Sequence, residues 1–212
     1  GDYQSQGLNL EAEAVLAPDI QPSTTTVPTV SHLGRIFLTG ATGFLGSQLL
    51  YELLTTTNAT ISCLVRANNL DAGWERLKDK LKTSGLWSED FSSRIIPIVG
   101  DLGISSFGLS ASQYNNLSQE IDVIYHLGVK VHHLLSYALL KNANVLGTEE
   151  VLRMASLAKI KPVHYVSTIS VFSTSQSDQP ILESATVDPR HLLKSCLLYT
   201  SPKPTRQSKI SY

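Results

Sequence analysis

The sequence is poor in cysteine, has no long apolar run and lacks a leader-like start. Its two cysteines, Cys63 and Cys196, lie far apart and match no metal-binding or disulfide pattern, so we expect neither a metal site nor a disulfide scaffold. No apolar run approaches the roughly 20 residues that span a bilayer, and the first residues lack the basic and apolar regions of a signal peptide. These absences predict a cytoplasmic protein without membrane contact.

An excess of basic charge is also missing, because the 212 residues carry a formal net charge of −1. We therefore expect no nucleic-acid partner, since binding to the phosphate backbone needs clustered positive charge. Hydrophobic residues make up 42% of the chain and charged residues 17%, which is enough apolar material for a core and excludes wholesale disorder. The length corresponds to about one domain, or one and a half.

The chain divides into three segments. Residues 1–34 contain four acidic residues, three prolines and no lysine or arginine, which is typical of a linker or of a strap lying on a domain, with a short helix near residues 8–16. Residues 35–195 hold the ordered pattern described below. Residues 196–212 (CLLYTSPKPTRQSKISY) contain two prolines and no amphipathic period, so we expect an irregular tail.

Residues 35–168 alternate short apolar runs with helical patterns. Leucines at helical spacing follow the first run, and further helical patterns follow the second and the fourth. Strands separated by helices form right-handed βαβ units, so the pattern predicts an α/β fold, a Rossmann-type doubly wound parallel sheet with helices on both faces. The expected strands are residues 35–39, 60–65, 94–99, 121–126 and 162–168.

A glycine-rich turn, GATGFLG, joins the first strand to the first helix, which is the context of a dinucleotide-binding turn. Its three glycines permit, in chain order, a tight turn, a close approach to a pyrophosphate and close packing of the helix. The helix start offers N–H groups and a positive dipole end to the phosphates. The alternative is a packing turn without a ligand. The expected cofactor contacts here are Gly40, Thr42, Gly43, Phe44 and Gly46.

The end of the second strand selects the cofactor. An enzyme that uses NAD places a carboxylate about 20 residues past the turn, to bind the ribose 2′-hydroxyl. This chain has Arg66 there, with no carboxylate beside it. A guanidinium suits a 2′-phosphate, so we expect NADPH rather than NADH. Arg76 is a candidate second contact, with a solvated helix arginine as the alternative.

Further cofactor contacts are expected after the third and fourth strands. Asp101 and the adjacent Leu102 follow the third strand, where such sheets hold the adenine, and the alternative for Asp101 is a turn or helix-cap aspartate. Gly128 follows the fourth strand and is expected under the middle of the cofactor. Asn144 opens a helical turn and is expected to bond backbone or an active-site water, with a helix cap as the alternative.

Six segments together resemble the thioester reductase domains: FLTGATGFLGSQLLYELL, CLVRA, VGDL, IYHLG, NANVLGT and HYVSTISVF. These extended short-chain dehydrogenase/reductases end many nonribosomal peptide synthetases and some polyketide synthases, and also occur in aminoadipate and carboxylic acid reductases. The resemblance covers about residues 8–195. It implies a linker at 1–34 after a carrier domain, and an NADP-binding reductase domain at 35–195 that is incomplete at its C-terminus.

The resemblance also implies the chemistry. The family uses NADPH to reduce an acyl or peptidyl thioester on the phosphopantetheine arm of a carrier protein to an aldehyde or alcohol. Its catalytic set is Ser/Thr–Tyr–Lys, for which Thr168 is the first match, with Ser167 beside it as a cofactor contact. Tyr199 and Lys203 match the Tyr-x-x-x-Lys pattern, but Pro202 between them conflicts with a helix.

Three alternatives stay open. The segment CLLYTSPKPTRQ at the start of the 196–212 tail resembles the translation of a sequencing-library adaptor, and in that case the tail is not native and Tyr199 and Lys203 match by chance. A fatty acyl-CoA reductase is the second enzyme hypothesis, although the segment LNLEAEAVLAPDIQP resembles a carrier-to-reductase linker and favours a carrier-bound substrate. A non-catalytic NADP-binding module is the third.

Overall fold

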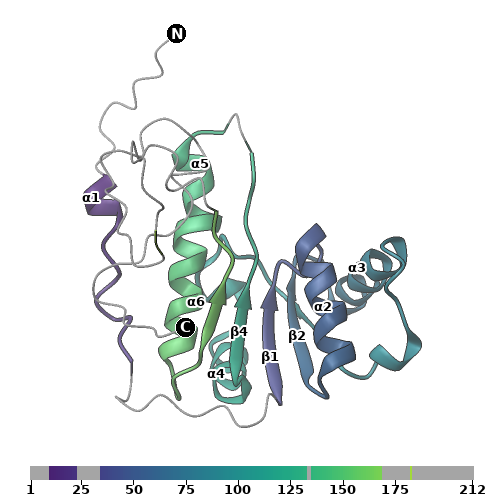
Figure 1. Ribbon diagram of the computed structural model, residues 1–212. Coiled ribbons are helices and arrows are strands. Elements are labelled where there is room, and N and C mark those ends of the chain that lie inside the picture. Colours follow the sequence, from purple (N-terminus) through teal and green to yellow (C-terminus); the bar gives the residue numbers. More distant parts are fainter. Residues whose placement is uncertain (1–9, 23–33, 133–134, 169–181, 183–212) are drawn as a thin grey trace.

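In the computed structural model, which describes residues 10–22, 34–132, 135–168 and 182, five strands form one parallel sheet. The strand order is β3-β2-β1-β4-β5 (Figure 1). Because β1 pairs with β2 on one side and β4 on the other, the chain reverses direction across the sheet at β1. The predicted Rossmann-type architecture is therefore confirmed. The strands are β1 (Arg35–Thr39), β2 (Thr60–Val65), β3 (Ile95–Val99), β4 (Val123–His126) and β5 (Val163–Tyr165).

Two apolar cores lie on the two faces of this sheet. Successive residues of β1 point to opposite faces, so Ile36 and Leu38 enter one core and Phe37 enters the other, all three fully buried. Both faces are thus covered by helices, as a parallel sheet requires. The first face is covered by α2 (Phe44–Thr56) and α3 (Leu70–Thr83), and the second by α4 (Ala111–Glu120) and α6 (Gly147–Ser156).

Helix α4 is an element that the apolar pattern did not predict. Its sequence, ASQYNNLSQE, is polar apart from Ala111, Tyr114 and Leu117, and the last two face the second core. A capping box starts it: the Ser110 hydroxyl accepts from the Gln113 N–H, and the Gln113 side chain accepts from the Ser110 N–H at 3.0 Å. This Ser-x-x-Gln signature is a sequence signal of a helix start, and the helix could have been predicted from it.

The long helical stretch predicted after the fourth strand is interrupted. Helix α5 (Tyr137–Lys141) and α6 are joined by a π-helical turn at Asn142–Leu146, in which the Gly147 N–H donates to the Asn142 carbonyl. Such a turn holds one more residue than an α-helical turn, and π turns are frequent at functional sites. Short 3₁₀ turns occupy Glu89–Phe91 and Ser105–Gly108.

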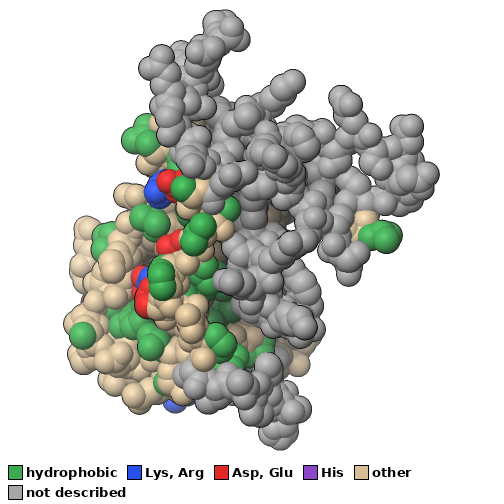
Figure 2. All heavy atoms as spheres, turned by 90° about the vertical axis from the view of Figure 1, so that its left-hand side faces the viewer, with side chains coloured by type: hydrophobic (Ala, Val, Ile, Leu, Met, Phe, Trp, Pro, Cys, Tyr) green, Lys and Arg blue, Asp and Glu red, His purple; other side chains and the backbone are tan. Residues whose placement is uncertain are grey.

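Residues 10–22, which include α1 (Leu10–Glu13), lie as a strap against α5 and α6 (Figures 1 and 2). The Glu13 carboxylate accepts from the Tyr137 hydroxyl at 2.7 Å and from Lys141 Nζ at 2.9 Å. Arg153 Nε donates to Asp19 at 2.6 Å, and Ile20 is buried. Of the two interpretations of this segment, the described part fits the strap, whereas a carrier domain before it stays a prediction. None of the described helices is long and apolar enough to cross a membrane.

Candidate cofactor cleft

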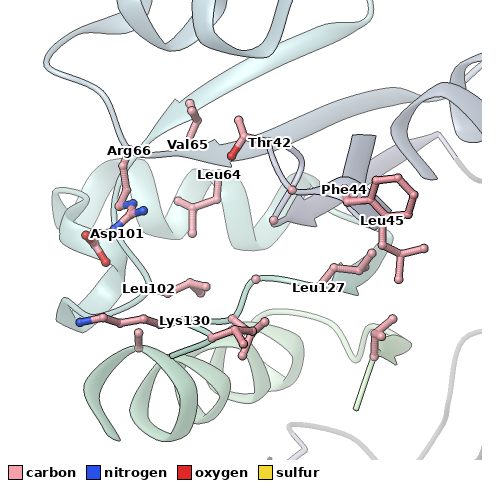
Figure 3. Close-up of a pocket in the computed structure, with 18 of the residues that line it drawn as sticks. Thr42, Phe44, Leu45, Leu64, Val65, Arg66, Asp101, Leu102, Leu127 and Lys130 are labelled. Atoms are coloured by element: carbon pink, nitrogen blue, oxygen red, sulfur yellow. The ribbon is translucent and has the colours of Figure 1, made fainter. Parts of the chain in front are cut away.

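A cleft of about 590 Å³ opens where β1, β2 and β4 end (Figure 3). This is the position at which ligands bind in open α/β sheets, since strand order reverses there. Twelve of the thirteen described residues that the sequence predicted for the site line it. They are Gly40, Thr42, Gly43, Phe44, Gly46, Arg66, Arg76, Asp101, Leu102, Gly128, Ser167 and Thr168.

The glycine turn closes one wall of the cleft and depends on two close approaches. Gly40 has φ +79°, and a Cβ on it would lie 2.7 Å from the Gly128 backbone nitrogen. A Cβ on Gly46 would overlap the Gly40 carbonyl oxygen. The turn therefore packs against the loop after β4 on one side and against its own helix on the other, and only glycine allows both contacts.

The start of α2 faces this cleft without a capping side chain. Its N-cap is Gly43, which makes no side-chain hydrogen bond, and its first turn contains no acidic residue. By contrast, Asn69 caps α3 and Ser110 caps α4 through side-chain oxygens. The first-turn N–H groups of α2 and its positive dipole end thus suit an anionic ligand such as a phosphate.

Positive charge gathers at one end of the cleft. Figure 3 shows the side chains of Arg66, Asp101 and Lys130 at that end, and those of Phe44 and Leu45 at the other. Within the described residues, no hydrogen bond or ion pair engages the Arg66 guanidinium or the Lys130 ammonium. This end therefore offers both cations to an anionic ligand. Lys130 was missed from the sequence, and its position two residues after Gly128 was the available signal.

Arg76 and Asp101 each make a side-chain hydrogen bond to the backbone at the edge of the cleft. Arg76 Nη1 donates to the Arg66 carbonyl at 2.7 Å, which holds a second guanidinium beside the cleft. Asp101 Oδ1 accepts from the Gly103 N–H at 2.8 Å. The turn-aspartate alternative therefore describes Asp101 correctly, although the residue also lines the cleft.

Asn144 is the predicted contact that the cleft does not include. Its side chain is buried, with Oδ1 accepting from the Lys130 N–H at 2.7 Å and Nδ2 donating to the Lys130 carbonyl at 3.0 Å. Asn144 therefore lies behind the loop that lines the cleft, and it bonds backbone, which was one of its expected roles. Tyr199 and Lys203 lie outside the described residues, so the catalytic set beyond Thr168 stays a prediction.

Comparison with known proteins supports the interpretation of the cleft as a site for a nicotinamide cofactor. The model of an NAD-binding family described as "Male sterility protein" matches residues 38–205. A linear gramicidin synthase of Brevibacillus parabrevis is 45% identical over 172 residues, which cover 81% of this chain and 3% of the synthase. The terminal R domain from the myxalamid PKS-NRPS biosynthetic pathway is 42% identical with a TM-score of 0.85, over 90% of this chain and 48% of that chain.

A second solved structure is a thiolation-reductase di-domain from an archaeal non-ribosomal peptide synthetase. It is 30% identical with a TM-score of 0.61, over 80% of this chain and 36% of that chain. This chain thus spans about half or less of the length of these relatives. The resemblance to reductase domains is confirmed, and the chain belongs to the NAD-binding family described as male sterility protein.

Proposed function

We propose that this chain binds NADPH in the cleft and reduces an acyl or peptidyl thioester, carried on a phosphopantetheine arm, to an aldehyde or alcohol. The observation that carries the proposal is the spread of the cleft residues across the sheet. Arg66 follows β2 and Thr168 follows β5, with β1 and β4 between them. Three strand spacings separate the two strands, or about 14 Å. An extended dinucleotide fits this arrangement, with its phosphate-bearing ribose near Arg66 and its nicotinamide near Thr168.

Each part of the cleft has a role in this proposal. Arg66 and Arg76 bind the 2′-phosphate, for which a guanidinium offers paired donors. The uncapped start of α2 binds the pyrophosphate across Gly43. When bound, the cofactor would supply a hydride to the thioester carbonyl carbon, and the aldehyde would form as the carbon–sulfur bond breaks and the phosphopantetheine thiol leaves. The Thr168 hydroxyl donates to the carbonyl oxygen, where negative charge develops.

The carrier-bound form of the substrate is supported by the relatives and by the N-terminal segment. Residues 1–34 would connect a carrier domain to the reductase unit at 35–195, and the strap at 10–22 would attach this connection to α5 and α6. The solved thiolation-reductase di-domain has the two kinds of domain in one chain. The partner is therefore a phosphopantetheinyl carrier that presents the thioester.

The cofactor part is tested by fluorescence titration of the full chain with NADPH and NADH. We expect binding in the micromolar range with a preference for NADPH of about tenfold or more, because charge-assisted bonds to the 2′-phosphate exist only with NADPH. Equal affinity for the two cofactors would contradict the role of Arg66. Absence of binding to either would overturn the proposal.

The substrate part is tested by NADPH consumption and aldehyde detection with the same acyl group on a carrier protein and on coenzyme A. We expect faster turnover of the carrier thioester. Faster turnover of the coenzyme A thioester would favour an acyl-CoA reductase instead. Binding of NADPH without turnover of either thioester would favour a non-catalytic NADP-binding module.

A further inference from the structure

His126, the last residue of β4, is a fully buried histidine behind the cleft. Its Nδ1 lies 2.6 Å from the hydroxyl of Thr39, the last residue of β1. Its Nε2 lies 3.0 Å from the hydroxyl of Thr148 in α6. The imidazole ring thus connects the centre of the sheet to the helix that covers it, and it does not line the cleft itself.

The hydrogen bonds continue from both threonines to one short segment of the cleft wall. On one side, the Gly128 N–H donates to the Thr39 hydroxyl at 2.9 Å. On the other side, the Thr148 hydroxyl donates to the Asn144 carbonyl at 2.7 Å, and the Asn144 side chain makes its two bonds to the Lys130 backbone. Both ends of this series, which we call the His126 bridge, therefore terminate on Gly128–Lys130.

The partners leave one consistent arrangement of protons in the bridge. The Thr148 hydroxyl uses its hydrogen on the Asn144 carbonyl, so it accepts from His126 Nε2–H. Burial lowers the pKa of His126 to about 4, which keeps the ring neutral near pH 7, so its single proton is on Nε2. The unprotonated Nδ1 then accepts from the Thr39 hydroxyl, whose oxygen accepts from the Gly128 N–H.

The irregular turn at Asn142–Leu146 belongs to the same arrangement. It carries Asn144, whose backbone carbonyl accepts from the Thr148 hydroxyl and whose carboxamide makes the final bonds of the bridge to the Lys130 backbone. Ala143 beside it lines the cleft. The π turn thus places Ala143 in the cleft wall and Asn144 in the His126 bridge.

We propose that the His126 bridge positions Gly128–Lys130 as the floor of the cofactor cleft, and that His126 is a positioning residue for cofactor binding. This rests on the proposed function, because NADPH is the ligand whose binding the floor would support. An apolar residue in place of His126 would remove one hydrogen bond from each of two buried hydroxyls, so that Thr39 keeps only its bond from Gly128 and Thr148 keeps only its bond to Asn144. The floor would then lose its fixed position although neither threonine nor histidine touches the ligand.

The first test observes the ring nitrogens directly. Nitrogen NMR of the full chain with isotope-labelled histidine, assigned by comparison with His126→Gln, is expected to show a protonated Nε2 and a non-protonated Nδ1 from about pH 5.5 to 8. A proton on Nδ1, or protons on both nitrogens in this range, would overturn the bridge. A role of simple space filling does not require either tautomer.

The second test measures NADPH affinity. We expect His126→Leu to weaken binding about tenfold, and His126→Gln, which keeps one donor and one acceptor, to weaken it less. Thr148→Val and Thr148→Ser form a matched pair, because only serine keeps the hydroxyl between His126 and Asn144. We expect a loss of affinity with valine and near wild-type affinity with serine.

Met154→Ala is the control for general destabilisation, since the Met154 side chain is fully buried in α6, does not line the cleft and takes no part in the hydrogen bonds of the bridge. We expect it to lower the melting temperature and leave NADPH affinity unchanged. If the His126→Leu and Thr148→Val proteins fold and bind NADPH like the wild type, the positioning role of the His126 bridge is overturned and the proposed function stands. A wild type that does not bind NADPH would overturn the proposed function, whereas the NMR result would still decide the bridge geometry.

Discussion

Arg66 follows β2 at the positive end of the cleft, where its guanidinium has no partner among the described residues. We expect Arg66→Gln to lower NADPH affinity about tenfold to a hundredfold, because charge-assisted bonds to the 2′-phosphate are lost, and to leave NADH affinity nearly unchanged. Titration with both cofactors measures the change in preference.

Arg35→Gln provides the matched control. Arg35 begins β1 at the opposite edge of the sheet, and its exposed guanidinium pairs with Glu120 at 2.9 Å. This variant removes the same charge from the molecule without touching the cleft, so its affinity for both cofactors should equal that of the wild type. If Arg66→Gln kept the preference for NADPH, the cofactor assignment would be wrong.

Thr168 lines the cleft after β5, next to Ser167. If its hydroxyl holds the thioester carbonyl oxygen, Thr168→Ala should lower kcat by about 10²–10³ while the Kd for NADPH changes little. Ser167→Ala should act mainly on the Kd, because Ser167 is the expected cofactor contact. Steady-state turnover combined with NADPH titration separates the two effects, and unchanged turnover in Thr168→Ala would contradict its catalytic role.

Single residues were predictable where backbone geometry decides their position. Gly40 and Arg66 follow the ends of β1 and β2, and parallel strands end at one edge of the sheet, so the sequence order alone brings them together. Asn144 lies on a helix, where the direction of a side chain depends on helix phase. The π turn changes that phase, and no apolar period revealed it. His126 was missed because the two hydrogen-bond partners of its ring, Thr39 in β1 and Thr148 in α6, come from elements that are distant in sequence.

Whole elements were predictable where apolar runs are sharply bounded. The ranges of β1 and β2 match the prediction residue for residue, since both are nearly continuous buried runs. The fifth strand was predicted at residues 162–168 but is only Val163–Tyr165, because the residues that follow turn along the cleft. Helix α4 was missed because its composition is polar and only its capping box indicates it.

The turn between β1 and α2 allows a prediction at this scale. Gly46→Ala would place a Cβ against the Gly40 carbonyl oxygen, so the helix must move away from the strand. We expect a loss of about 1–3 kcal/mol in the free energy of unfolding, or more, together with weaker NADPH binding. Urea unfolding monitored by circular dichroism measures the first effect.

Gly85→Ala is the control that separates the cost of a steric clash from the cost of an unfavourable backbone conformation. Gly85 has φ +71° but open space around the position of a Cβ. Its substitution should cost about 1–2 kcal/mol from the left-handed conformation alone, with no effect on NADPH binding. If Gly46→Ala bound NADPH as well as Gly85→Ala does, the close packing of the turn would not matter for the cleft.

The whole molecule combines a rigid doubly wound sheet with a cleft whose parts come from segments distant in sequence. The glycine turn, the loops after β2 and β4, and the residues after β5 meet only because the strands lie side by side. The strap adds two attachments on the helix side, through Glu13 and Asp19. The fold as a whole followed from the βαβ pattern, whereas the path of the strap depended on tertiary ion pairs that leave no local signal.

The stability of the whole molecule should depend on pH through His126. Burial lowers its pKa to about 4, against about 6.5 in the unfolded chain. Between these values the unfolded chain binds a proton that the folded chain does not, so the free energy of unfolding should fall by about 3 kcal/mol as the pH drops from about 6.5 to 4. His126→Gln removes this dependence.

The remaining loss in the free energy of unfolding of the His126→Gln variant should occur mainly at lower pH. Protonation of Glu13 and Asp19 breaks the strap bonds there, because Lys141 lowers the pKa of Glu13 and Arg153 lowers that of Asp19. Urea unfolding of both proteins across this range measures the difference, and parallel pH profiles would show that His126 is not buried as a neutral ring.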